Sequence, residues 1–254
     1  MNSSVIPVKT AGRVLTFRKG LRDGLPICLG YLSVSFAYGM MAVEGGLPVW
    51  AAVLISMTNL TSSGQVAGTS LIFAGGSFLE IGITTFVINI RYMLMSLSLS
   101  QKVEEGMSSL ARSILAFGNT DEVFAVAMQQ HGRIPSCYLS GLILMPYFGW
   151  TLGTLLGAAC TGILPLSVRS ALGIAIYGMF IAIIIPPARH SRAILATVVF
   201  ATGISCLFAF TPVLNRLSSG WVIILCAILA AGFAAYRFPV DVEPLEEEDV
   251  WPST

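Results

Sequence analysis

The segment from Cys137 to Thr161 reads CYLSGLILMPYFGWTLGTLLGAACT and contains no charged side chain. A helix needs about 20 mostly apolar residues to cross the hydrocarbon core of a bilayer, and this segment exceeds that length. Other apolar segments lie at 25–43, 49–74, 78–100, 170–187, 193–213 and 219–236, with a shorter mixed one at 110–130. We therefore predict an all-α, polytopic helical membrane protein with six to seven spans and one or two broken or re-entrant segments.

The composition of the chain supports this fold class. Of its 254 residues, 55% are apolar and 11% are charged, whereas about 25% of the residues in soluble domains are charged. The mean hydropathy is +0.81, which excludes an ordinary water-soluble enzyme. The five cysteines show no metal-ligand spacing, so we expect them to be packing residues and predict no metal site.

Charged residues gather at the two ends of the chain and in a few loops. Residues 1–24 are polar and basic, which predicts a cytoplasmic leader in front of a transmembrane domain at 25–236. The apolar run that follows the leader is too long for a signal-peptide core, so we expect the leader to stay attached. Residues 237–254 are rich in acids and are expected to form a solvated C-terminal tail.

The 49–74 segment is too long for a simple span, since one helix of that length would extend about 39 Å. Its middle is rich in Ser, Thr, Asn and Gly, which favours a break. If the segment crosses the bilayer once, the basic loops that follow fall outside, against the positive-inside rule. A re-entrant hairpin instead leaves eleven of the fourteen basic residues, and both termini, in the cytoplasm. We favour the hairpin; the alternative is seven spans, with 110–130 as an eighth or as a surface helix.

The 110–130 segment has a similar shape, with polar residues at 118–122 between two short apolar runs. In the hairpin arrangement it enters the membrane from the cytoplasmic side. Two broken segments that enter from opposite faces would form an inverted repeat, which transporters use to build a site near the bilayer midplane. This symmetry is a hypothesis that the structure can test.

Arg91 lies in the apolar segment 78–100. A cation at the bilayer centre costs about 2.5–3.5 kcal/mol on insertion scales, so it is expected to face protein or a water-filled cavity. Glu80 shares its helix face but lies about 16 Å away along the axis. By elimination, Asp121 or Glu122 is the best candidate partner. The alternative is that Arg91 extends to the cytoplasmic headgroups as an anchor.

The break in the 49–74 segment is the first candidate binding site. It would expose hydroxyls and backbone N–H groups at membrane depth, and the helix N-terminus beyond a break favours a carboxylate. We therefore predict a substrate-binding set of six residues: Ser62, Ser63, Gly64, Gln65, Asn89 and Arg91. The alternative interpretation is a seam of small residues for close helix packing.

The adjacent acids Asp121 and Glu122 are the second candidate site, because they follow the break in the 110–130 segment. Carboxylates there could bind a substrate ammonium or exchange a proton, since burial disfavours their charged form. The alternative is a solvated acidic pair in a loop. Gly149, Gly153 and Gly157 form a small-residue face suited to close helix contact, which could include a partner subunit.

Four stretches of the sequence together resemble the AzlC family of branched-chain amino acid exporters. They are a basic, Gly- and Pro-containing stretch at 17–26, the Ser- and Gly-rich stretch at 56–65, the Asn-x-Arg pattern at 89–91, and the Asp-Glu pattern at 121–122. The family usually has His where this chain has Tyr92, and it orders the glycine and serine of the second stretch differently. The resemblance covers residues 17 to about 236.

The resemblance implies secondary-active export of branched-chain and related apolar amino acids across a bacterial-type inner membrane. It also implies a separately encoded, small AzlD-type membrane subunit and no cofactor. A homo-oligomer is left open, and nucleic acid is not expected as a partner. The two histidines, His131 and His190, lie in charged loops and no nucleotide-binding motif is present, so we do not expect an enzyme. The alternative function is a channel or a non-transporting assembly subunit of a membrane complex.

Overall fold

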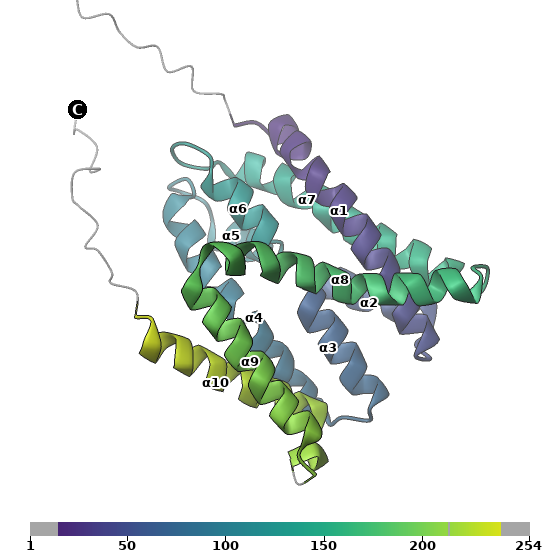
Figure 1. Ribbon diagram of the computed structural model, residues 1–254. Helices are drawn as coiled ribbons and strands as arrows, with labels where there is room; N and C mark the ends of the chain where they lie inside the picture. Colours follow the sequence, from purple (N-terminus) through teal and green to yellow (C-terminus); the bar gives the residue numbers. More distant parts are fainter. Residues whose placement is uncertain (1–14, 213, 240–254) are drawn as a thin grey trace, which may run out of the picture. The chain divides into compact units, whose positions relative to one another are not determined.

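The computed structural model describes residues 15–212 and 214–239 and confirms the all-α fold (Figure 1). In order, the helices of these residues are α1 Phe17–Glu44, α2 Val49–Thr58, α3 Ser62–Phe73, α4 Phe78–Lys102, α5 Ser109–Phe117, α6 Asp121–Met128, α7 Ser136–Cys160, α8 Leu166–His190, α9 Arg192–Phe210, the 3-10 helix η1 Leu214–Arg216 and α10 Ser219–Arg237.

Five of these helices, α1, α4, α7, α9 and α10, are long and apolar enough to cross a membrane. Helix α8, with 25 residues, matches α4 and α7 in length. The described part of the chain thus has six long helices, at the lower end of the predicted number of spans. The 49–74 and 110–130 segments are each divided into two short helices, as predicted.

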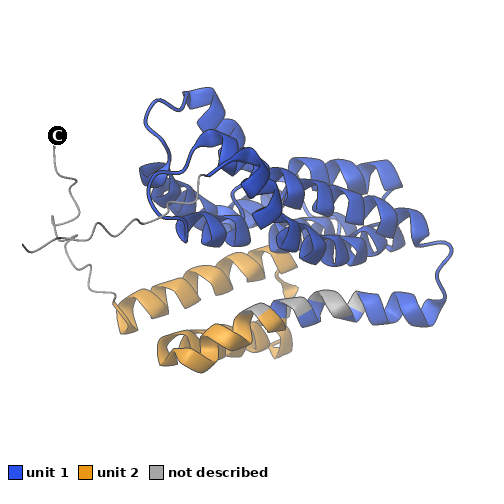
Figure 2. Cartoon of the chain, turned by 90° about the horizontal axis from the view of Figure 1, so that it is seen from above, with its two compact units in different colours: residues 1–180 blue, residues 181–254 orange. Residues whose placement is uncertain are grey.

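The chain divides into two compact units, Met1–Phe180 and Ile181–Thr254 (Figure 2). The first unit contains α1 to α7 and the first part of α8. In the second unit α9 and α10 pack against each other, and the rings of Phe200 and Phe233 stack with centroids 4.2 Å apart. The candidate site residues all belong to the first unit.

Helix α1 begins at Phe17, inside the predicted leader at 1–24. Thr16 adopts an extended backbone and its hydroxyl accepts a hydrogen bond from the Lys19 amide at 3.2 Å, which is an N-terminal cap. The basic side chains of residues 18–22 are therefore on the first turns of the helix that carries the first span. The rest of the leader, residues 1–14, and most of the predicted acidic tail, residues 240–254, lie outside the described residues.

Helices α1 and α7 run parallel and in close contact (Figure 1). Glycines on both helices allow this approach, because a Cβ at any of them would meet the backbone of the other helix. These glycines are Gly20, Gly24 and Gly39 on α1, and Gly141, Gly149, Gly153 and Gly157 on α7. Gly20 faces Tyr138 at the start of α7, and Gly157 faces Phe36 near the far end of α1. The contact therefore extends along nearly the whole of both helices.

The contact between α1 and α7 corrects the suggestion that the glycine face of α7 could bind a partner subunit. Gly149, Gly153 and Gly157 are covered by α1 of the same chain. Small residues at helix contacts let backbones approach closely, and in lipid such packing is a main source of helix association. The prediction that these glycines form a close helix contact is confirmed, but the contacting helix is α1 of the same chain.

Helices α2 and α3 form a hairpin that opens at the C-terminal end of α1. The ring of Phe73, the last residue of α3, lies against Gly45, which caps α1. Midway along the hairpin, Ile55 of α2 and Val66 of α3 both pack on the buried cluster around Tyr38. The chain therefore runs along α2 away from the C-terminal end of α1, turns at residues 59–61, and runs back along α3 toward the same end of α1. The predicted hairpin is confirmed, and a single crossing by 49–74 is not.

Helices α5 and α6 form a second hairpin that opens at the other end of α1. Gln130, just after α6, accepts a hydrogen bond from Lys19 Nζ at 3.2 Å, near the start of α1. The Met128 carbonyl at the end of α6 accepts one at 2.6 Å from Lys102 Nζ, at the end of α4. The two hairpins thus enter the bundle from opposite ends, as the inverted-repeat hypothesis requires.

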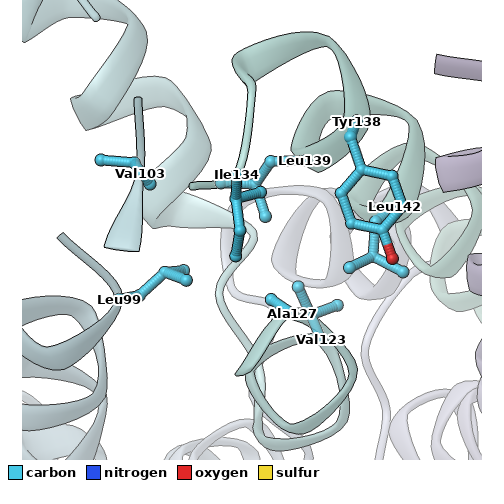
Figure 3. Close-up of a cluster of buried hydrophobic side chains, with 8 residues drawn as sticks. All are labelled: Leu99, Val103, Val123, Ala127, Ile134, Tyr138, Leu139 and Leu142. Atoms are coloured by element: carbon cyan, nitrogen blue, oxygen red, sulfur yellow. The ribbon is translucent and has the colours of Figure 1, made fainter. Parts of the chain in front are cut away.

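A buried apolar cluster anchors the second hairpin (Figure 3). Val123 and Ala127, on one face of α6, are fully buried and point toward Tyr138 and Leu142 of α7. The full cluster consists of Leu99, Val103, Val123, Ala127, Ile134, Tyr138, Leu139 and Leu142. Because α7 also packs along α1, the same helix fixes the position of α6 relative to α1.

The loop between α4 and α5 caps the start of α7 with a carboxylate. Glu104 accepts a hydrogen bond from the Ser136 amide at 2.8 Å, and hydrogen bonding to the Ser136 hydroxyl and to this amide holds the pKa of Glu104 below its usual value. A lowered pKa in the folded state stabilises the fold at pH values above the ordinary glutamate pKa, and the effect is lost as the pH falls through the lowered value.

We expect Glu104→Gln to reduce the melting temperature of the detergent-solubilised protein at pH 7 and to have a smaller effect as the pH is lowered toward 3. The reason is that the wild-type carboxylate becomes protonated, and loses its advantage over Gln, as the pH falls through its lowered pKa. Thermal melts of both proteins across this pH range test the prediction. A difference that persists unchanged at low pH would contradict a role for the charge of Glu104.

Candidate functional site

The turns of the two hairpins lie at the start of short helices whose N-termini are capped by threonines. Thr61 accepts a hydrogen bond from the Gly64 amide at the start of α3, and Thr120 accepts one from the Val123 amide at the start of α6. Both threonines are buried. The free N–H groups and the positive dipole end of a helix favour anions, so each hairpin presents one such end at its turn.

Arg91 of α4 forms an ion pair with Asp121, the first residue of α6. The Arg91 Nη2 and Asp121 Oδ2 atoms are 2.9 Å apart, which confirms the partner predicted by elimination. The two side chains remain 47% and 42% exposed, respectively, so the pair is open to its surroundings. A charge at this depth normally faces a water-filled cavity or another protein surface. Both side chains of the pair are therefore accessible from outside the protein.

Asn89 and Tyr92 connect Arg91 with the first hairpin. Thr61, at the turn of that hairpin, donates a hydrogen bond to Asn89 Oδ1 at 2.8 Å. The Arg91 guanidinium donates to the Tyr92 hydroxyl at 3.3 Å and lies 5.0 Å from the centre of its ring. The Tyr92 side chain also interacts with Thr61. Asn89 and Arg91 thus belong to one polar group at which the turns of both hairpins meet.

Gln65 has a different environment from the other predicted residues, because both ends of its amide are paired. Its Nε2 donates to Ser56 at 2.5 Å, and its Oε1 accepts from Trp150 Nε1 at 2.9 Å. Ser56 in turn shares a hydrogen bond of 2.7 Å with Thr154. Gln65 is 1% exposed. It therefore ties α2 and α3 to α7 and holds the hairpin turn in place.

Ser62, Ser63 and Gly64 form the first turn of α3. Gly64 is buried against Asn89, and a Cβ at this position would come within 3.1 Å of the Asn89 amide. Ser62 and Ser63 are partly exposed. Of the predicted set at this break, these two serines are the residues whose hydroxyls and backbone amides are free to meet a ligand.

Glu122 contacts a residue that the sequence did not single out. The Tyr31 hydroxyl of α1 donates a hydrogen bond to Glu122, and the Tyr31 ring packs edge-on against Trp150 at 5.3 Å. Since Trp150 also binds Gln65, a continuous chain of contacts joins Glu122 of the second hairpin to Gln65 of the first. The sequence feature that could have indicated these contacts is Trp150, because the N–H group of a buried Trp side chain needs a hydrogen-bond acceptor.

These features define the class of protein: a polytopic helical membrane protein in which two opposed re-entrant hairpins meet at a charged site between long helices. The chain belongs to the AzlC family. The pattern of that family, described as AzlC protein, matches residues 26–164. The matched region runs from α1 to the end of α7, and so includes both hairpins and every candidate site residue.

Several membrane proteins are similar to this chain along most of its length. It is 25% identical over 228 residues to the inner membrane protein YgaZ of Escherichia coli, covering 87% of this chain and 91% of YgaZ. It is 34% identical over 181 residues to an uncharacterized membrane protein of Archaeoglobus fulgidus, covering 70% of this chain and 79% of that protein. No solved structure matches the chain.

Proposed function

We propose that this chain is the large subunit of a secondary-active exporter of branched-chain and related apolar amino acids, working with a small AzlD-type membrane subunit. The observation that supports this most strongly is the Arg91–Asp121 pair at the meeting point of the two hairpins. Broken helices that meet near the midplane are the usual construction of substrate sites in secondary transporters. Resemblance to the AzlC family supports the choice of substrate.

An amino acid is a zwitterion, and the Arg91–Asp121 pair has the same two charges. In the proposed mechanism, the substrate carboxylate replaces Asp121 at the Arg91 guanidinium and takes further hydrogen bonds from the α3 N-terminus at Ser62 and Ser63. The substrate ammonium replaces Arg91 beside Asp121 and Glu122. The internal ion pair would then satisfy both charges whenever the site holds no substrate, which avoids leaving a lone charge in the membrane.

The arrangement of the hairpins gives each side of the membrane its own path to the site. Because α2–α3 opens at one end of α1 and α5–α6 at the other, small movements of either hairpin would open the site to one side only. Proton exchange at Asp121 or Glu122 could couple these movements to an ion gradient. The Tyr31–Trp150–Gln65 contacts join the two hairpins and would carry the movement of one to the other.

The distribution of basic residues gives the proposed orientation. Lys19, Lys102 and Arg133 lie at the end of the first unit where α5–α6 opens, and the positive-inside rule assigns this end to the cytoplasm. Arg169, at the start of α8 beside the other end of α1, forms an ion pair with Glu44 at 2.6 Å, which balances its charge. We propose that the protein resides in a bacterial-type inner membrane with its N-terminus inside.

The proposal is tested by amino-acid efflux from cells fed a valine- or leucine-containing dipeptide, with and without this chain and its small subunit. We expect efflux that saturates with substrate and responds to a pH gradient, and that requires both proteins. Measurements of amino-acid flux in reconstituted vesicles distinguish the proposed exporter from the alternative functions. Flux that neither saturates nor moves substrate uphill would indicate a channel, and efflux that is unchanged by removal of this chain would indicate an assembly subunit.

A further inference from the structure

A cavity of about 110 Å³ lies between α4, α5 and α7, next to the turn of the second hairpin. Six of its lining residues are apolar: Leu99, Val103, Met107, Leu115, Ala116 and Leu139. The other four lining residues are polar, namely Ser96, Ser100, Arg112 and Asn119. Asn119 Nδ2 donates to Ser96 at 3.0 Å, and Asn119 stands two residues before Asp121 of the Arg91–Asp121 pair in the chain.

The chemistry of this cavity suits a hydrocarbon group better than a chain of water molecules. A buried water needs two to four polar partners, and cavities with apolar walls tend to stay dry. Its volume of about 110 Å³ leaves room for a short branched aliphatic group. Ligand sites commonly combine such an apolar lining with a few placed polar groups.

Asn119 adds an observation that points to a ligand. It is 4% exposed, and among the described residues its Oδ1 has no hydrogen-bond partner. A buried acceptor without a donor is unfavourable, so native structures rarely leave one unpaired. The substrate ammonium, held beside Asp121 in the proposed mechanism, is a donor that could reach this oxygen from the mouth of the cavity.

We propose that this cavity is the subsite for the aliphatic side chain of the exported amino acid, and that Ala116 and Leu115 set the size that it accepts. The inference rests on the proposed function. Ala116 is an exposed residue of α5 that lines the cavity, so a larger side chain can fill the space without disturbing the core. Leu115 lines the same cavity and is partly buried against α7, so shortening it would enlarge the space.

The test measures efflux of leucine and valine from cells that carry this chain with its small subunit. One methylene group in an apolar pocket typically changes discrimination by about 10- to 200-fold. We expect Ala116→Leu to lower the ratio of leucine to valine efflux about 10-fold, and Leu115→Ala to raise export of phenylalanine relative to valine. The control Ala111→Leu makes the same change on α5 at a residue that does not line the cavity, and should leave both ratios unchanged.

Immunoblots of membranes show whether each variant is inserted at the wild-type level. Equal changes for leucine and valine in Ala116→Leu, or no change at all, would overturn the subsite while leaving the exporter proposal intact. If the wild-type chain exports none of these amino acids, the proposed function fails and the subsite fails with it. A shift in the size of the preferred substrate that only the cavity variants produce would support the assignment.

Discussion

Replacing Arg91 by Ala is expected to lower amino-acid efflux about 10- to 150-fold while membrane insertion stays normal. The range corresponds to the loss of one hydrogen bond to a charged group, worth about 1.5–3 kcal/mol. The variant removes the group that would hold the substrate carboxylate and also leaves Asp121 without its partner at 2.9 Å. Efflux assays with membranes matched for protein content measure the effect.

Two further variants separate binding from structure at this pair. Asp121→Asn keeps the size of the side chain and should also impair efflux, whereas Arg91→Lys keeps the positive charge and should retain part of it. Arg133→Ala is the control, because Arg133 lies in a loop outside the site, where it bonds the Val103 carbonyl and forms an exposed pair with Glu105 that is expected to contribute only about 0–1 kcal/mol. If Arg91→Ala and Asp121→Asn both export at the wild-type rate, the pair has no part in transport.

The sequence predicted the position of this pair because charges are rare in the apolar segments. Arg91 needed an acceptor, its own helix had none within reach, and Asp121 and Glu122 were the acids nearest to a break. The count of basic loops likewise indicated a hairpin at 49–74, since a single crossing would have placed those loops on the wrong side. Both arguments depend on where the charged residues lie, and their positions can be read directly from the sequence.

The contacts of Gln65, Tyr31 and Trp150 could not be predicted in the same way. Helix α7 is apolar over most of its length and α3 mixes small, polar and apolar residues, and neither has one distinct polar face, so periodicity does not tell which residues turn toward which neighbour. The pairing of Gln65 with Trp150, which are 85 residues apart in the chain, depends on the rotation and register of α3 and α7. The roles proposed for Ser62, Ser63 and Asn89 at the site remain predictions.

The parallel pair of α1 and α7 provides the frame on which both hairpins rest. Helix α7 holds α6 through the apolar cluster around Val123 and holds α2 through the Ser56–Thr154 hydrogen bond. Helix α1 contacts the first hairpin through Tyr38 and Thr69, and the second through Tyr31 and Glu122. Since each hairpin touches both long helices, the spacing of α1 and α7 sets how the two turns meet at Arg91.

Gly153→Leu is therefore expected to disrupt the fold itself. A Cβ at this position would lie 3.0 Å from Leu32 Cα on α1 and closer still to the Leu32 carbonyl. Since the obstacle is backbone on a packed helix, the two helices would have to move apart. Overpacking a core typically costs about 1–3 kcal/mol, and a backbone obstacle places this variant at or above the upper end.

For a chain of this size, about 3 kcal/mol corresponds to a fall of about 6–12 °C in the melting temperature. Melting of the detergent-solubilised protein, followed by size-exclusion chromatography, measures this fall or the loss of a monodisperse species. Gly82→Leu is the matched control, because Gly82 lies within α4 and, apart from its chain neighbours and the adjacent backbone of α4, no described atom is within 4 Å of a Cβ built there. Equal melting temperatures for the two variants would show that close contact between α1 and α7 does not determine the stability of the fold, and the frame assigned to these two helices would be wrong.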